Sequence, residues 1–302
     1  MKGSGIMSDY IMLILADLFL AINFAVSKIY QRRAGTSFKA GFTFSALTGL
    51  FTSLIFWIYN GFSFAFSAFS AIIAVLLSLL GTTYTLLGFR IMKRQGMSLY
   101  TLFLMTGGMT LPYLFGLFFL NEQFSVLRTV GLIVIIAGVF FTGFGKEKPD
   151  RISMILCVVV FILNGCVSIV NKMHSINTVL AVAPQEFVVL SGLVGFAVNM
   201  ILRFTVRDPK DALPQKEKFS PKLLLTFVLI PVISAVVGGV SSVLQLTGAQ
   251  TIDASLLYPF ITGGSIVFST LTGWLVFREK LSKNMIIGVI CAFAGTLLFL
   301  EF

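Results

Sequence analysis

The chain has 302 residues, of which 57% are hydrophobic and 11% are charged, and its formal net charge is +10. Soluble globular domains carry about 25% charged residues, so this composition excludes an ordinary soluble protein and predicts an integral membrane protein. The basic residues stand in short connectors between apolar runs, where they act as topology signals, and we expect no nucleic-acid partner.

Ten apolar stretches follow one another along the chain, and each can cross a hydrocarbon core of about 30 Å. They are too long for the strands of an outer-membrane barrel and lack the alternation of such strands. We therefore predict an all-α membrane protein without a cofactor or a metal site. The predicted spans are residues 10–30, 40–60, 69–91, 97–120, 126–144, 152–172, 184–203, 221–249, 254–277 and 284–300.

Two segments of the chain repeat each other 157 positions apart. "LFGLFFLNEQFSVLRTVGLIVIIAG" (114–138) and "LTGWLVFREKLSKNMIIGVICAFAG" (271–295) are identical at eight positions without a gap. They contain spans 4–5 and 9–10, so the repeating unit has five helices. An odd number of crossings requires the second unit to enter the membrane inverted. We predict two inverted repeats, residues 1–145 and 146–302.

The distribution of basic residues predicts the orientation. The odd-numbered connectors contain 19 of the 22 Lys and Arg residues, and the remaining three are Lys2, Arg128 and Lys172. Because basic connectors stay in the cytoplasm, we expect a multi-pass protein of the cytoplasmic (inner) membrane with both termini outside.

The repeated segments, together with "TIDASLLYPF" before the second copy, resemble the drug/metabolite transporter superfamily, in its EamA-like branch. The resemblance covers essentially the whole chain. It implies a secondary active transporter and is weak for the substrate, since the family carries amino acids, drugs, nucleotide sugars, sugar phosphates and quaternary amines. It also implies that spans 1, 3 and 8 line the pathway and that spans 5 and 10 are peripheral.

Glu122 and Glu279 recur just before Ser125 and Ser282. We interpret these residues as helix-start signals, with the serines as N-caps and the carboxylates near free amides; a coupling site is the alternative. Glycines seven positions apart in spans 5 and 10 allow close helix packing, as scaffold or dimer contact. We therefore expect a monomer, or a homodimer through spans 5 and 10, surrounded by membrane lipid.

Asp17 is an acid inside span 1, where intramembrane acids are functional by default. It favours proton coupling or a cationic substrate; the structural alternative is an acid that stays protonated or reaches the outer interface. Asp17 has no acidic counterpart in span 6, which offers Phe161 there. Lys28 and Lys172 are repeat mates, and snorkelling at helix ends explains both. Lys172, however, is expected on the outer face, where the charge rule disfavours a base. Its presence there also suggests a gate or an anionic group that binds it.

Small polar residues form stripes on several spans, which line a cavity or serve as ordinary helix-packing contacts. Spans 4 and 9 also contain helix breakers, the usual pointer to a midplane site, although Pro and Gly are frequent in membrane helices. The remaining substrate candidates are Asn23, Thr82, Tyr84, Thr85, Tyr113, Asn164, Ser168, Asn171, Ser242, Gln245 and Tyr258, and the breakers are Gly107, Gly108, Pro112, Pro259, Gly263 and Gly264.

The function expected from these patterns is secondary active transport of a small polar metabolite, such as an amino acid, an amine or a drug-like solute, by alternating access. Proton coupling would pass through Asp17. The alternatives are an exchanger for an anionic metabolite that uses Lys28 and Lys172, and a non-transporting membrane receptor or assembly factor. An enzyme is not expected, because His174 has no cluster of acids or further histidines around it in the sequence.

Overall fold

The computed structural model describes residues 3–35, 37–95, 97–143, 150–206, 225–278 and 282–300, and within these ranges it is built from helices without a strand. The helices are α1 (Gly3–Ala34), α2 (Phe38–Tyr59), α3 (Ala68–Gln95), α4 (Met97–Phe119), α5 (Val126–Gly143), α6 (Arg151–Ile176), α7 (Pro184–Thr205), the π-helical turn η1 (Leu225–Leu229), α9 (Ile230–Thr251), α10 (Ala254–Phe277) and α11 (Lys283–Leu297).

Each of the ten predicted spans corresponds to a helix, so the prediction of an all-helical membrane protein is confirmed. Eight of the helices are long and apolar enough to cross a membrane, while α5 and α11 are apolar but shorter. Ser37 begins α2 by accepting a hydrogen bond from the Ala40 amide, and Ser282 begins α11 by accepting one from Met285. Ser125 accepts one from Arg128 at the start of α5, so the predicted N-caps Ser125 and Ser282 are confirmed.

The chain divides into two compact units, whose boundaries fall inside α1, α3 and α9. Unit 1 contains residues 1–17, 79–176 and 246–302, and unit 2 contains residues 18–78 and 177–245. Each unit therefore takes segments from both predicted repeats. The compact units are a division in space and the repeats are a relation in sequence, so the two divisions need not coincide.

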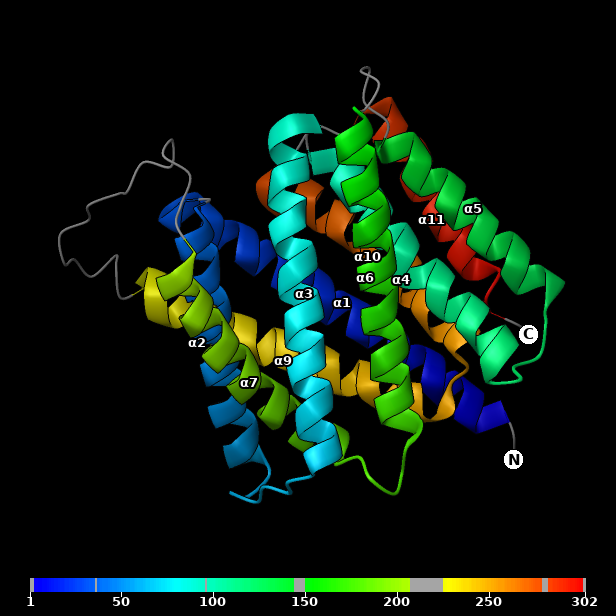
Figure 1. Cartoon of the computed structure of the whole chain (residues 1–302). Coiled ribbons are helices and arrows are strands. Elements are labelled where there is room, and N and C mark those ends of the chain that lie inside the picture. Colours follow the sequence, from blue (N-terminus) through cyan, green and yellow to red (C-terminus); the bar gives the residue numbers. More distant parts are fainter. Residues whose placement is uncertain are drawn as a thin grey trace. The chain divides into compact units, whose positions relative to one another are not determined.

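In unit 1, α4 packs against α6 and α10, and α5 packs against α11, as Figure 1 shows. The α5·α11 contact is made by the glycines that the repeat preserves. A side chain at Gly131 would meet the Gly295 carbonyl oxygen, and one at Gly138 would meet the Gly288 carbonyl oxygen. The order of these contacts makes the two helices antiparallel. The glycines of spans 5 and 10 thus form a close contact inside the chain.

In unit 2, α2 packs against α7 through a similarly close glycine contact. A side chain at Gly49 would lie 2.7 Å from the Gly192 carbonyl oxygen, and the Ser53 hydroxyl donates to the Val189 carbonyl at 2.8 Å. The buried ring of Tyr30 lies 4.5 Å from the ring of Phe44 between centroids. Small residues let these helices approach closely, and the Ser53 hydroxyl is hydrogen-bonded across the contact.

Candidate functional site

Asp17 is the most unusual side chain of unit 1. It lies on α1, its exposed fraction is 0%, and neither carboxyl oxygen has a hydrogen-bond partner among the described residues. Gly264 of α10 faces this carboxyl group, and any side chain at position 264 would overlap it. Gly264, predicted as a helix breaker, therefore makes the space that Asp17 occupies. The helix itself continues through Gly264 without interruption.

A cavity of about 150 Å³ borders Asp17, and we name it the Asp17 pocket. Its other polar side chain is Thr296, whose hydroxyl donates to the Ala292 carbonyl of its own helix at 2.7 Å. The carboxyl group of Asp17 therefore faces an almost wholly apolar space. The pocket is lined by Ile14, Asp17, Phe260, Gly264, Val267, Phe268, Phe293, Thr296, Leu297 and Leu300.

A second group of charges surrounds the junction of α9 and α10. The buried Lys172 ammonium donates to the carbonyls of Ala249 and Ile252, at 2.9 and 2.6 Å. The Glu122 carboxylate accepts from the amides of Ala254 and Ser255, at 2.6 and 2.8 Å. A cation thus lies at the carboxyl end of α9 and an anion at the amino end of α10, which are the signs that the two helix dipoles favour.

The contact made by Glu122 differs from the prediction. We expected Glu122 to meet the amides of the helix that follows it in the chain, but it binds the first turn of α10, which belongs to the other repeat. The positive end of any nearby helix satisfies a carboxylate equally well. Its repeat mate Glu279 lies outside the described residues. Lys172 is buried, and its ammonium donates to carbonyls at the end of α9.

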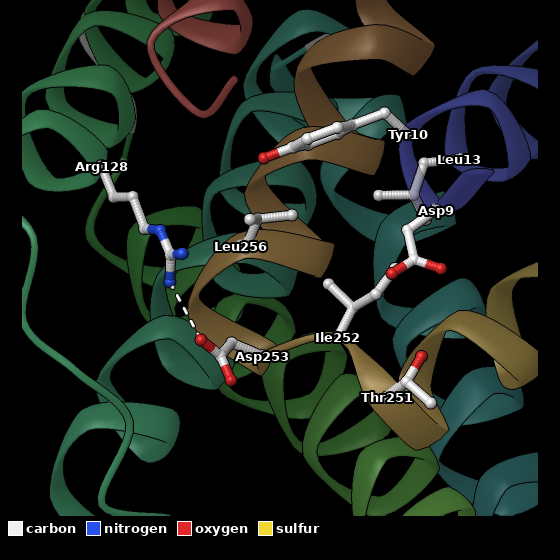
Figure 2. Close-up of a pocket in the computed structure, with 8 residues that line it drawn as sticks. All are labelled: Asp9, Tyr10, Leu13, Arg128, Thr251, Ile252, Asp253 and Leu256. Atoms are coloured by element: carbon white, nitrogen blue, oxygen red, sulfur yellow. Dashed lines mark hydrogen bonds and ion pairs between the residues drawn. The ribbon is translucent and has the colours of Figure 1, made fainter. Parts of the chain in front are cut away.

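The junction is also the floor of an open cavity of about 220 Å³, the junction pocket, which Figure 2 shows. Arg128 of α5 forms an ion pair with Asp253 at 3.1 Å on one side of this pocket, and Asp9 of α1 lies on the other side. The pocket therefore contains two carboxylates and one guanidinium. Its lining is Asp9, Tyr10, Leu13, Arg128, Thr251, Ile252, Asp253 and Leu256.

The predicted polar face of α6 turns toward α4. Pro112 has no amide hydrogen, so the carbonyl of Gly108, four residues earlier, lacks its helical donor. Ser168 supplies this donor at 3.1 Å, and the Asn164 amide donates to the Leu104 carbonyl at 2.8 Å. We expected the breakers of span 4 to free backbone groups for a ligand. In the structure, side chains of α6 bind these backbone carbonyls instead. Both α4 and α10 are continuous helices through Pro112 and Pro259.

The other predicted site residues do not form one cluster. The buried Tyr113 hydroxyl bonds to Thr129 of α5 at 2.7 Å, and half-buried Tyr84 packs with Tyr100 beside Cys157. Thr85 bonds to the carbonyl of Gly81 in its own helix. Thr82, Asn171 and Tyr258 are half-buried in unit 1, Gly107 faces the α6 backbone at Phe161, and Gly263 faces Thr296.

Four predicted residues belong to unit 2. Asn23 of α1 accepts a hydrogen bond from Ser234 of α9 at 2.6 Å, and Gln245 donates to Ser241 at 3.0 Å. Lys28 is half-buried and Ser242 is exposed. Asn23 thus binds α1 to α9, a role that fits helix packing as well as it fits a cavity wall.

The sequence interpretation did not identify Asp9, Tyr10, Arg128 and Asp253 as site residues. One signal was present: Arg128 and Lys172 are two of the three bases that depart from the charge rule. Both meet the same junction, where they bind Asp253 and the end of α9. A base that departs from the charge rule therefore marked a place where a charge is held by a partner.

These features define a multi-pass, helical membrane protein with a buried acid and a charged junction. Residues 151–301, half of the chain, match the model of the EamA-like transporter family, and the chain belongs to that family. The resemblance predicted from the repeated segments is thereby confirmed. No curated protein matches the sequence.

Solved structures support the fold. Twenty-eight chains of known structure match this one. One of them, described as a crystal structure of a protein, has 17% sequence identity and a TM-score of 0.70. The match covers 98% of this chain and 96% of that chain. At this level of identity the likeness concerns the fold.

Proposed function

We propose that this membrane transporter is a secondary active transporter of a small polar metabolite in the cytoplasmic membrane, and that it couples transport to a proton or a cation at Asp17. The observation that carries the proposal is the complete burial of the Asp17 carboxyl group without a hydrogen-bond partner among the described residues. Membership of a transporter family supplies the class of function.

The energetic argument for Asp17 is simple. An unpaired carboxylate in an apolar interior costs several kcal/mol, whereas a carboxyl group that carries a proton or faces a cation costs far less. When Asp17 carries a proton or faces a cation, its carboxyl group can stay buried. When it is ionised and has no cation beside it, the carboxylate is stable only in contact with water. Loading and unloading of Asp17 would therefore favour different conformations, which is the requirement for coupling.

We further propose that alternating access uses two inverted repeats, and paired contacts in unit 1 support this. Gly131 contacts Gly295, and Gly138 contacts Gly288. In the repeat, Gly131 corresponds to Gly288 and Gly138 corresponds to Gly295. Replacing each glycine by its repeat mate therefore turns one contact into the other. Two contacts that are exchanged in this way are what a two-fold axis between α5 and α11 produces.

A second pair of contacts links the same relation to Asp17. Gly107 of α4 faces Phe161 of α6, and Gly264, the mate of Gly107, faces Asp17 of α1. Spans 1 and 6 correspond at an offset of 144 positions, which pairs Lys28 with Lys172 and Asp17 with Phe161. Gly107 meets the main chain of Phe161, whereas Gly264 meets the carboxyl group of Asp17. The proposed coupling site is thus a point at which two related contacts differ in chemistry.

The anion-exchanger alternative depends on the lysines. Lys172 is buried and directs its ammonium to the carbonyls of Ala249 and Ile252, so an anionic substrate would have to displace both hydrogen bonds. Lys28 belongs to the other compact unit. Helix capping explains the contacts of Lys172 without a ligand, and we therefore favour a proton or a cation as the coupled species.

The test uses purified protein in proteoliposomes. A thermal-shift screen against amino acids, amines, nucleotide sugars and sugar phosphates identifies a ligand, since a ligand stabilises the state that it binds. The flux of that ligand is then measured with and without a pH gradient. In Asp17→Asn the gradient should no longer drive accumulation, while counterflow continues. Glu186→Gln, on α7 in unit 2, is the control and should retain coupling.

Wild-type coupling and wild-type pH dependence in Asp17→Asn would overturn the assignment of Asp17. If the screen instead finds only anionic ligands, and Lys172→Met abolishes their transport while Asp17→Asn does not, the exchanger is the correct function.

A further inference from the structure

The Asp17 pocket and the junction pocket adjoin each other along α1. Asp9, Tyr10 and Leu13 line the junction pocket, and Ile14 and Asp17 line the Asp17 pocket one turn further along. The partner helix continues in the same order, because Leu256 of α10 lines the junction pocket and Phe260 lines the Asp17 pocket. Successive turns of α1 and α10 therefore line first a charged pocket and then the pocket that contains the buried acid.

Tyr10 lies between the two cavities. Its ring lines the junction pocket and lies 5.9 Å, between centroids, from the ring of Phe260 in the wall of the Asp17 pocket. Its hydroxyl donates to the carbonyl of Phe299 at 3.0 Å, and the next residue, Leu300, also lines the Asp17 pocket. Figure 2 shows the tyrosine above Leu256 and Leu13. One side chain thus touches the walls of both cavities.

The charges of the junction pocket favour cations over anions. Asp9 and Asp253 supply two carboxylates against the single guanidinium of Arg128, which is paired with Asp253. Carboxylates at the mouth of a narrow, low-dielectric passage raise the local concentration of cations. Asp17 is the eighth residue after Asp9 on α1, which corresponds to a rise of about 12 Å along the helix axis.

We propose that the junction pocket is the port through which a cation, either a proton or a small organic ammonium, reaches Asp17, and that Tyr10 closes this port. The inference rests on the proposed exchange of a cation at Asp17, for which it supplies the route. We take the structure to be the closed state of this port, because Tyr10, Leu13 and Leu256 line the junction pocket on the turns of α1 and α10 that precede the Asp17 pocket.

The chemistry of Tyr10 suits a barrier that opens often. Its aromatic ring excludes water, and its hydroxyl donates a neutral hydrogen bond to a main-chain carbonyl. The loss of such a bond costs about 1 kcal/mol net, so this contact can be exchanged for water at a modest cost. The route through the Asp17 pocket is different, because that pocket is lined by apolar side chains and exposed Phe293 and Leu297, and it would admit hydrophobic molecules instead.

The experiment compares two carbodiimides, which modify carboxyl groups, on intact protein in lipid nanodiscs. The water-soluble, cationic reagent EDC should reach Asp17 through the junction pocket, and the hydrophobic reagent dicyclohexylcarbodiimide should reach it through the Asp17 pocket. Modification of the Asp17 peptide is measured by mass spectrometry, with Asp17→Asn as the blank. Protein unfolded in SDS gives the full labelling rate.

In Tyr10→Phe we expect the EDC labelling rate to rise about fivefold, the factor that corresponds to the loss of one neutral hydrogen bond. Tyr10→Ala should raise it further, and neither change should alter dicyclohexylcarbodiimide labelling by a comparable factor. Tyr113→Phe is the matched control: Tyr113 is also a buried tyrosine of unit 1 with a bonded hydroxyl, but it lines neither pocket. Its EDC labelling should equal that of wild type.

Equal EDC rates in wild type, Tyr10→Phe and Tyr10→Ala would overturn the proposal. So would a rise of the same size in Tyr113→Phe, because general loosening would then explain the result. Thermal unfolding of each variant is measured in parallel, and Tyr10→Phe, which retains the ring, tests the port if Tyr10→Ala does not fold. A different result would contradict the proposed function. If Asp17→Asn kept coupled flux, Asp17 would not be the coupling site, whatever the labelling rates of the Tyr10 variants.

Discussion

At the scale of single residues, the α9–α10 junction shows how charge is buried in this protein. Lys172 contacts two carbonyls at the end of one helix, and Glu122 contacts two amides at the start of the next. Each of these two charges meets the partial charge of a helix end, so neither is buried without a partner. The helix ends act as fixed counter-charges, and their positions decide which lysine and which glutamate can be buried.

This arrangement predicts the effect of removing the Lys172 ammonium. Lys172→Met keeps most of the side-chain volume but leaves the carbonyls of Ala249 and Ile252 without their donor, and we expect a loss of about 2–3 kcal/mol in the free energy of unfolding. Thermal unfolding in detergent measures it. The exposed Lys283→Met should shift the midpoint little. Equal shifts in the two variants would refute a capping role for Lys172.

At the scale of elements, the α4·α6 contact shows a helix interruption that a neighbouring helix repairs. Pro112 removes the donor for the Gly108 carbonyl, and Ser168 replaces it from across the interface. Such compensation by a serine of an adjacent helix is one way in which proline is tolerated in a membrane span. The polar face of α6 and the proline of α4 are therefore one structural feature divided between two helices.

A double-mutant cycle tests this coupling. Ser168→Ala alone should cost about 1 kcal/mol, because the Gly108 carbonyl loses its donor. Pro112→Ala restores an amide hydrogen at position 112, which can bond to Gly108 within α4. In the Pro112→Ala background we expect Ser168→Ala to cost close to nothing, as measured by thermal unfolding. Additive effects of the two changes would show that Ser168 and Pro112 act independently.

The same element shows how far sequence reasoning reaches. The ten helices were predictable because each is a long apolar run, and Ser125 and Ser282 were predictable as caps because an N-cap acts on amides two or three residues away. The partner of Glu122 was not predictable, since its amides lie in a helix more than a hundred residues further along. The direction of the α6 polar face was left open for the same reason: a stripe of Asn and Ser has the same spacing whether it lines a cavity or meets a broken helix.

The candidate site was predictable in part. Asp17 could be singled out because an acid within an apolar run is rare, and its carboxyl group is buried. Its role in coupling stays a prediction. Tyr10 and Asp253 could not, because a tyrosine and an aspartate near span ends are ordinary in membrane proteins. What distinguishes them is a cavity between helices that are distant in sequence, and only tertiary contacts reveal it.

At the scale of the whole molecule, the contacts of unit 1 bear on topology. Glu122 follows span 4, Arg128 lies at the start of span 5 and Lys172 lies at the end of span 6. All three are therefore beside even-numbered connectors, which the charge rule assigns to one side, and all three meet the α9–α10 junction. Their convergence agrees with the grouping of even-numbered connectors on one face of the membrane. Which face that is remains a prediction from the distribution of Lys and Arg.

Cysteine labelling measures the orientation. In a variant without the native cysteines, we place Val179→Cys in the exposed α6–α7 connector or Gln31→Cys at the exposed end of α1. A membrane-impermeant maleimide added to intact cells should label Val179→Cys and spare Gln31→Cys, because the charge distribution predicts that the first is outside and the second cytoplasmic. Labelling of Gln31→Cys alone would reverse the orientation.

The contact between Asp17 and Gly264 also has a consequence for how the protein is made. Asp17 leaves the ribosome with the first helix, whereas Gly264 follows 247 positions later, a delay of about ten to fifty seconds at ordinary rates of synthesis. Until α10 has been synthesised, the nascent chain contains Asp17 without the helix that covers it. An aspartate at the centre of a membrane span disfavours insertion by about 2.5–3.5 kcal/mol. The unfinished chain therefore depends on the insertion machinery to shield α1. Ribosome-bound chains that end before α10 are expected to be the form most open to membrane proteases.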